Sequence, residues 1–214
     1  STVNGFVPIG GSGSFVGHYD GGNFTIDNLT ITSGLGNVGL FSTVGDGSLI
    51  ENIVLGEHST ISSNNTKGYV GSIAGVLARY SSATVQNCVN YAAVVGNMKG
   101  DWNGGGYAGG IVGAVLGQSS VTGCINSAEI ELTQGYLGGV AGYVGTGASL
   151  LRCTNNKNMK NAQAKYLGGI AGKNAGRIEQ CAIGDTVQVS GSQYVGGVAG
   201  VNEGTIVSIS LGTN

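Results

Sequence analysis

The chain has 214 residues, of which 43 are Gly and one is Pro, and hydrophobic residues make up 41% of it. This hydrophobic content is too high for a disordered chain, and the Gly residues do not recur at every third position as collagen requires. Because 9 basic residues nearly balance 11 acidic ones, for a net charge of −2, no strong field attracts a nucleic acid or an anionic membrane.

The opening segment, residues 1–36, differs from the rest of the chain. It contains the only Pro, Pro8, and the phrases FVPIG and FVGHYDGGNFTIDNLTI, in which short apolar runs alternate with Gly-rich turns. A stack of strands needs cover at its end, because an open strand edge can pair with another chain. We predict that residues 1–36 form the first coil and the N-terminal cap of a repeat structure.

From residue 37 onward a short phrase recurs. A degenerate copy, NVGLFST, begins at Asn37, and five closer copies such as YLGGVAG follow at steps of about 30 residues, a period that marks a repeat architecture. These five copies begin at Tyr69, Tyr107, Tyr136, Tyr166 and Tyr194. We expect the five rings to form a column, packed on one another at a corner with their hydroxyls in water. The alternative is an exposed ribbon of rings that holds the faces of sugars.

A second phrase lies between the copies of the first and centres on a Cys. The four Cys recur once in each of four successive repeats, at Cys88, Cys124, Cys153 and Cys181. Repeat spacing predicts a ladder of buried, reduced thiols, with Leu29, Ile53 and Ile209 at the same position in the outer coils. Zinc sites need close Cys pairs, which are absent, and stacked in-register Cys rarely reach the torsion of a disulfide.

Two further marks keep a fixed distance from the Cys. Asn90, Asn126 and Asn155 each come two positions after one of the first three Cys, and this pattern predicts a ladder of turn residues whose amides bond to one another. An apolar residue follows each Cys by six positions, at Val94, Ile130, Met159 and Val187.

Short apolar runs, rich in Val, Ile and Tyr and bounded by Gly, Asn and Ser, indicate strands. The Gly content excludes long helices. One repeat of about 28–30 residues is too short for a propeller blade, which needs roughly 40, and suits one coil of a stacked solenoid. The sequence predicts an all-β fold, a right-handed parallel β-helix of about seven coils in one domain, residues 1–214. Residues 37–205 hold the repeats. Residues 206–214 form a last partial coil, which we expect to continue in a longer parent chain with other domains.

The phrases YLGGVAG, YLGGIAG and YVGGVAG resemble the GLUG repeat of bacterial surface and secreted proteins, including the N-terminal region of some immunoglobulin A metallopeptidases. The resemblance extends from Phe6 to Leu211. It implies a β-helix and an extracellular or cell-surface location in a bacterium. The His-Glu-x-x-His zinc motif of the peptidases is absent from this chain, so peptidase activity does not carry over.

One insertion interrupts the repeat. The coil between Cys88 and Cys124 is longer than the others, and the excess lies in GNMKGDWNGGG, residues 96–106. Insertions in solenoids form loops on one face, often the binding face. This loop holds the only Trp, Trp102, between Asp101 and Asn103, a combination that suits a sugar ring and its hydroxyls. The alternative is that Trp102 folds back over an apolar coil edge.

Candidate catalytic groups are sparse. A β-helix enzyme needs a cluster of acidic or basic residues on adjacent coils, and the sequence shows no such cluster. His18 and His58 have no evident partners, and no metal or cofactor motif is present. We therefore expect a non-catalytic structural or adhesive module of a secreted or cell-surface protein, binding a glycan or a host surface protein and no nucleic acid or membrane interior. The alternative is a polysaccharide-degrading β-helix enzyme, a lyase or a glycoside hydrolase.

Overall fold

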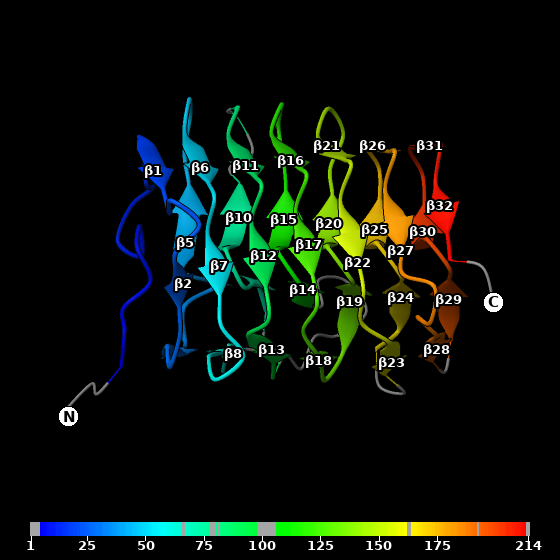
Figure 1. Cartoon of the computed structure of the whole chain (residues 1–214), viewed down its shortest axis with the longest axis horizontal. Coiled ribbons are helices and arrows are strands. Elements are labelled where there is room, and N and C mark those ends of the chain that lie inside the picture. The colour runs from blue at the N-terminus through cyan, green and yellow to red at the C-terminus, as the bar shows by residue number, and fades with distance from the viewer. Residues whose placement is uncertain are drawn as a thin grey trace.

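A computed structural model describes residues 5–65, 67–77, 80, 82–97, 106–161, 164–191 and 193–212. These residues form 32 short strands and no helix. Within the same ranges, therefore, no helix is long and apolar enough to cross a membrane. The chain winds from the N-terminus to the C-terminus in successive coils that stack side by side (Figure 1).

Each full coil contributes one strand to each of five walls, numbered here in the order in which a coil visits them. Wall 1 carries the recurring Tyr and consists of β4 (Asn37–Val38), β9 (Tyr69–Gly71), β14 (Gly106–Gly109), β19 (Gly135–Gly138), β24 (Tyr166–Gly168) and β29 (Tyr194–Gly196). Wall 2 consists of β5 (Phe41–Val44), β10 (Ala74–Leu77), β15 (Val112–Val115), β20 (Ala141–Val144), β25 (Ala171–Asn174) and β30 (Ala199–Asn202).

The other three walls complete the coil. Wall 3 consists of β1 (His18–Asp20), β6 (Leu49–Glu51), β11 (Thr84–Gln86), β16 (Ser120–Thr122), β21 (Ser149–Leu151), β26 (Arg177–Glu179) and β31 (Thr205–Val207). Wall 4 consists of β2 (Thr25–Ile26), β7 (Val54–Leu55), β12 (Val89–Asn90), β17 (Ile125–Asn126), β22 (Thr154–Asn155), β27 (Ala182–Ile183) and β32 (Ser210–Leu211). Wall 5 consists of β3 (Thr30–Ser33), β8 (Thr60–Ser63), β13 (Ala93–Gly96) and β18 (Ile130–Leu132), followed by the pair β23 (Met159–Asn161) and β28 (Val189–Gly191).

Every strand pairs in parallel with its counterpart in the next coil, as the register of Tyr107 on Tyr136 and of Val85 on Val121 illustrates. This arrangement confirms the predicted all-β parallel solenoid. Walls 3 and 4 contain seven strands and walls 1 and 2 contain six, so the molecule has about six complete turns. At the N-terminal end, Ile9 and Phe15 form bridges to Phe41 and Val44, and the rings of Phe15 and Phe41 are 4.9 Å apart.

The core has two parts. One apolar cluster lies among walls 2, 3 and 4, and a second lies between walls 1 and 5. They are separated where the two-residue bend from wall 1 to wall 2 presses inward on wall 4. There an added Cβ at Gly110 or Gly139 would collide with the side chain of Asn126 or Asn155. Gly is required at these bends because the backbone approaches a side chain from the opposite wall.

The four Cys form one column in the larger cluster. Each is fully buried and none is in a disulfide. The backbone N–H of Cys88 donates to Sγ of Cys124, at 3.4 Å, and the same bond joins Cys153 to Cys181. Burial raises the pKa of the Cys124 thiol, so this thiol stays protonated at neutral pH.

Two assignments made from the repeat are wrong in the outer coils. Leu29 does not share the Cys position, because its backbone bonds to Ser59 and Thr60, in the turn before wall 5. Four residues, 21–24, separate β1 from β2, whereas two residues separate β6 from β7 in the next coil. The residues that follow in the first coil, Leu29 included, are therefore shifted relative to the repeat. Likewise Val189, rather than Val187, pairs with Met159, because the turn before β28 has five residues instead of three.

Candidate binding surface

The tyrosine column, Tyr69, Tyr107, Tyr136, Tyr166 and Tyr194, stands on the outer side of wall 1. Successive ring centroids are 5.4, 4.7, 4.3 and 4.8 Å apart, and the planes of neighbouring rings differ by 28°, 10°, 8° and 15°. The rings therefore lie face to face along the solenoid axis. This follows from the register, since parallel strands about 4.8 Å apart bring identical residues together.

Stacking uses the ring faces for contacts within the protein. The first four rings are partly buried and Tyr194 is 55% exposed. Burial raises the pKa of Tyr107 to about 12 and also raises that of Tyr136. A sugar cannot lie on a face that a neighbouring ring covers, so between its two ends the column offers only ring edges, and Tyr194 at one end is more than half exposed. The five rings are thus packed against one another, and only their edges face outward along the column.

The column also covers the outer side of wall 2. Val76 and Ala114 point outward from wall 2 but are only 5% and 0% exposed, and they pack in a small cluster with Tyr69 and Tyr143. The rings of Tyr107 and Tyr143 are 5.5 Å apart. Walls 1 and 2 therefore have apolar packing on both sides, which fixes the position of the tyrosine column.

Each coil passes from the end of wall 5 to the start of wall 1 beside this column, and the residues between those two strands are named here the corner loops. They are residues 34–36, 64–68, 97–105, 133–134, 162–165 and 192–193, so their lengths vary from two to nine residues. The bends from wall 1 to wall 2 have two residues in every coil. Hydrogen bonds link neighbouring corner loops, from Asn65 Nδ2 to the carbonyl of Gly34 (2.8 Å) and from Asn97 Nδ2 to Asn64 Oδ1 (3.4 Å). Lys165 Nζ lies 5.1 Å from the centre of the Tyr166 ring.

The residues singled out for sugar contact, Trp102, Asp101 and Asn103, lie outside the described residues. The strands on either side of their loop are described. β13 ends at Gly96, and β14 begins at Gly106, directly before Tyr107 of the tyrosine column. The loop that holds Trp102 is therefore the longest corner loop. It leaves wall 5 at Gly96 and enters wall 1 at Gly106, beside the tyrosine column.

Sequence reasoning missed the partners of the two His. His18 Nε2 lies 2.7 Å from Glu51 Oε1, and Gln86 Nε2 donates to Glu51 Oε2 at 2.7 Å. His58 Nδ1 lies 2.7 Å from Asp27 Oδ2. Each pair joins the first coil to the second. No sequence signal marks these pairs, because their members are separated by a whole coil and each pair occurs only once.

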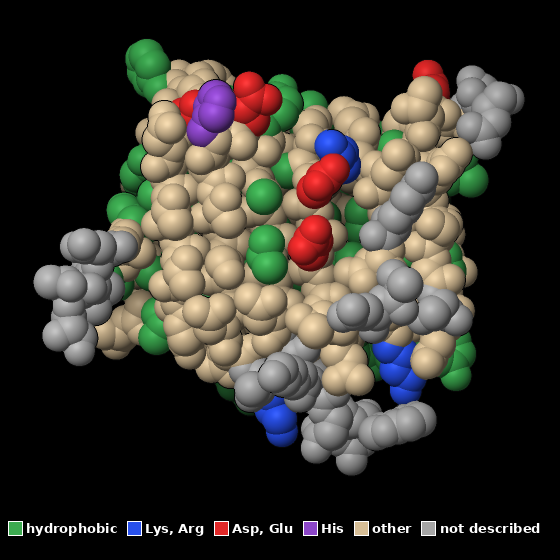
Figure 2. All heavy atoms as spheres, turned by 90° about the horizontal axis from the view of Figure 1, so that it is seen from below, with side chains coloured by type: hydrophobic (Ala, Val, Ile, Leu, Met, Phe, Trp, Pro, Cys, Tyr) green, Lys and Arg blue, Asp and Glu red, His purple; other side chains and the backbone are tan. Residues whose placement is uncertain are grey.

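Asp20 lies beside Glu51 on wall 3, in direct register. Its Oδ1 accepts hydrogen bonds from Asn52 Nδ2 (2.9 Å) and from the N–H of Gly22 (2.8 Å), which lower the pKa of Asp20. Asp20 and Glu51 are therefore neighbours on adjacent strands, and Glu51 is bonded to His18, a grouping that the sequence analysis did not find. Figure 2 shows a different side of the molecule, the side of wall 5 and away from wall 3, where a His also lies beside acidic side chains near the N-terminal end. Among the described residues, no three His, Cys, Asp or Glu side chains are placed to hold a metal ion.

The three Asn of wall 4 form a sealed ladder. Asn90 Nδ2 donates to Asn126 Oδ1, and Asn126 Nδ2 donates to Asn155 Oδ1, each at 3.0 Å. Each amide also bonds to the backbone two residues further on. All three side chains are fully buried, so this ladder is a structural element that ligands cannot reach.

The chain matches no protein-family profile. A stretch of 114 residues, 52% of the chain, is 38% identical to part of Halomucin from Haloquadratum walsbyi, and it spans about 1% of the length of that protein. The crystal structure of a putative immunoglobulin A1 protease from Bacteroides ovatus aligns with 96% of this chain and 74% of its own, with a TM-score of 0.68 and 17% sequence identity. At that identity the likeness shows a shared fold.

Proposed function

We propose that this chain is a non-catalytic β-helix module of a secreted or cell-surface protein, which holds binding loops at fixed spacing and contacts a glycan or a host surface protein. The observation that carries the proposal is the corner beside the tyrosine column. There loops of two to nine residues leave a scaffold whose neighbouring bends do not vary in length. Solenoids bind through such variable loops on one face.

The comparisons support the location. Halomucin and immunoglobulin A1 protease are names that fit proteins working outside the cell. The resemblance of YLGGVAG and its copies to the GLUG repeat points the same way. The proposed contact residues are Trp102 as a stacking platform and Asp101 and Asn103 as partners for hydroxyls, because their loop is the longest at this corner.

A glycan array tests this function with three proteins. The native chain is compared with Trp102→Ala and with the control Phe24→Ala, which removes an aromatic ring that is 79% exposed elsewhere on the surface. We expect a glycan that the native protein and Phe24→Ala bind equally and that Trp102→Ala binds on the order of 10-fold more weakly, the usual scale for one stacked ring. Equal binding by all three proteins would place the site elsewhere. A large drop in melting temperature for Trp102→Ala would show that the ring covers the core.

A second candidate, a polysaccharide-degrading enzyme, rests on the Asp20, Glu51 and His18 cluster. Adjacent carboxylates are the machinery of glycoside hydrolysis. Against this role, both oxygens of Glu51 are already engaged, by His18 and Gln86, and Asp20 is held in its ionised form. Incubation with a panel of polysaccharides decides the matter. Release of reducing ends or of unsaturated products that Glu51→Gln abolishes would establish the enzyme and refute the non-catalytic proposal.

A further inference from the structure

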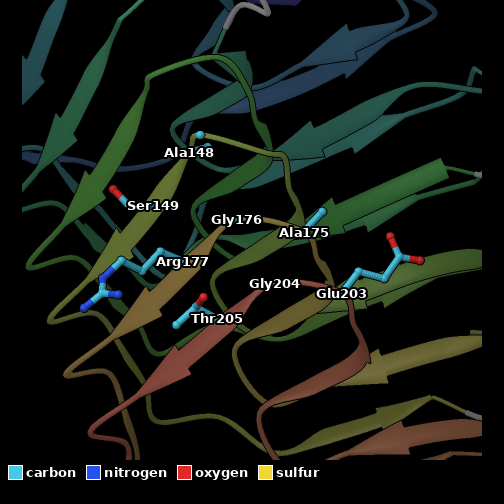
Figure 3. Close-up of a pocket in the computed structure, with 9 residues that line it drawn as sticks. Ala148, Ser149, Ala175, Gly176, Arg177, Glu203, Gly204 and Thr205 are labelled. Atoms are coloured by element: carbon cyan, nitrogen blue, oxygen red, sulfur yellow. The ribbon is translucent and has the colours of Figure 1, made fainter.

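A polar hollow of about 580 Å³ lies at the corner between walls 2 and 3, in the last three coils. Its lining consists of residues 147–149, 175–177 and 203–205 (Figure 3). The hollow arises from a change in turn length. The turn from wall 2 to wall 3 has four residues in the coil of β20 and two residues in the coils of β25 and β30. The four-residue turn therefore projects beyond the two shorter turns beside it.

The floor of the hollow is rigid. An added Cβ at Gly176 would collide with the carbonyl oxygens of Gly145 and Ala148, and one at Gly204 would collide with that of Gly176. Beneath the floor, Asn174 Nδ2 donates to Asn202 Oδ1 at 2.7 Å, and Asn174 Oδ1 accepts from the N–H of Gly176 at 3.1 Å. The two short turns are thus tied to one another and present the partly exposed backbone of Gly176 and Gly204 to the hollow, so the hollow exists before any ligand binds.

One side of the hollow carries a guanidinium between two hydroxyls. Ser149, Arg177 and Thr205 are in register on adjacent strands of wall 3, and Figure 3 shows their side chains on the same side of the Gly176 backbone. Arg177 Nε donates to Glu179 Oε2 at 2.8 Å, which uses one of five guanidinium N–H donors. Glu203 points away on the opposite side and pairs with Lys173 Nζ at 2.9 Å.

This lining favours one class of ligand. It has no apolar side chain larger than Ala, so an apolar molecule gains little there. The planar fork of Arg suits a carboxylate, and hydroxyl and backbone groups suit sugar hydroxyls. We propose that the hollow binds a carboxylated sugar residue, its carboxylate on Arg177 and its hydroxyls on Ser149, Thr205 and the backbone of the short turns.

This site lies at a different corner from the loop that holds Trp102, because it joins walls 2 and 3 and not walls 5 and 1. It extends the proposed function by naming a sugar class, and either site can fail without the other. A variant at Trp102 tests the first site and a variant at Arg177 tests the second, so the two results are read separately.

The experiment titrates the full chain with trigalacturonate by calorimetry, and with its methyl ester, which has the same sugars without the charges. Arg177→Thr removes the guanidinium and is compatible with the fold, since Thr205 occupies the same position in the next coil. Arg152→Gln is the matched control. It also removes one positive charge from an exposed side chain near Glu179, and Gln180 takes the equivalent left-handed conformation in the next coil.

We expect the native chain to bind trigalacturonate and to bind its methyl ester at least 10-fold more weakly. Arg177→Thr should weaken trigalacturonate binding about 10-fold or more, the scale of a charged hydrogen bond, with an unchanged melting temperature. Arg152→Gln should change the affinity for trigalacturonate less than about threefold at physiological salt, where exposed charges are screened. The proposal is overturned if trigalacturonate does not bind, if the ester binds equally well, or if both variants weaken binding to the same extent.

Discussion

The asparagine ladder of wall 4 and the tyrosine column of wall 1 are both built from one residue type repeated in consecutive coils. The ladder is fully buried and its amides bond to one another and to the backbone. The column stands outside, with ring faces covered and edges toward water. A sealed polar ladder depends on every member, because a missing partner leaves buried groups without hydrogen bonds. A stacked outer column loses only contact area when one ring is removed.

The largest expected effect comes from breaking the sealed ladder. Asn126→Ala removes the partner of Asn90 Nδ2 and of Asn155 Oδ1, together with two bonds to the backbone of Ala128. We expect a loss of about 2–5 kcal/mol in the free energy of unfolding, measured by urea denaturation.

A triple variant sharpens this prediction. Replacing Asn90, Asn126 and Asn155 together by Leu should destabilise less than Asn126→Ala alone, because no amide is left without a partner. Aliphatic residues already occupy this position in the flanking coils, at Leu55 and Ile183. A triple variant that loses the sum of three single losses would contradict the account of the ladder.

The cysteine column should respond next most strongly. Cys124→Ser places a hydroxyl in a fully buried apolar position and should cost about 1–3 kcal/mol of unfolding free energy. Cys124→Val should cost less, because Ile53 and Ile209 hold the same position in other coils. Rapid reaction of all four thiols with a polar reagent in the folded protein would contradict their burial.

Because of the tyrosine column, we expect the free energy of unfolding to fall at alkaline pH. The pKa of Tyr107 is raised to about 12 in the folded chain, whereas a Tyr in the unfolded chain ionises near pH 10. The unfolded state therefore loses its proton first, and this contribution to stability is present below pH 10 and disappears as the pH rises from about 10 to 12. Melting temperatures measured across this range should fall less steeply for Tyr107→Phe than for the native chain.

The smallest effect should come from the exposed pair of Asp27 and His58. The hydrogen bond to Asp27 raises the pKa of His58 above its ordinary 6.5, so the pair stabilises the fold below that pH and less as the pH rises through the folded value. An NMR titration of His58 should show this raised pKa, and Asp27→Asn should return it to the ordinary value. An unchanged titration curve of His58 in Asp27→Asn would show that Asp27 does not raise the pKa of His58.

The sequence predicted the columns and missed the isolated contacts, for a physical reason. Identical residues at a fixed spacing must coincide when coils stack, so the positions of the Cys, Asn and Tyr followed from the repeat alone. Leu29 and Val187 were misplaced because additional turn residues shift the register. The pairing of His18 with Glu51 occurs once and had no periodic signal. The hollow did leave a weak signal in the sequence. The stretch from Tyr166 to Cys181 is shorter than the stretch from Tyr136 to Cys153 in the preceding coil.

The central claim is that the buried columns stabilise the fold, whereas the outer loops and the hollow bind glycans. One paired measurement tests this claim most directly. Melting temperature and dissociation constant for one array-identified glycan are measured for Trp102→Ala and for Asn126→Ala, well below the melting transition of each. The account predicts that Trp102→Ala weakens binding about 10-fold at an unchanged melting temperature. It also predicts that Asn126→Ala melts many degrees lower and binds like the native chain. If both variants lose stability and binding together, the separation between scaffold and binding surface does not exist.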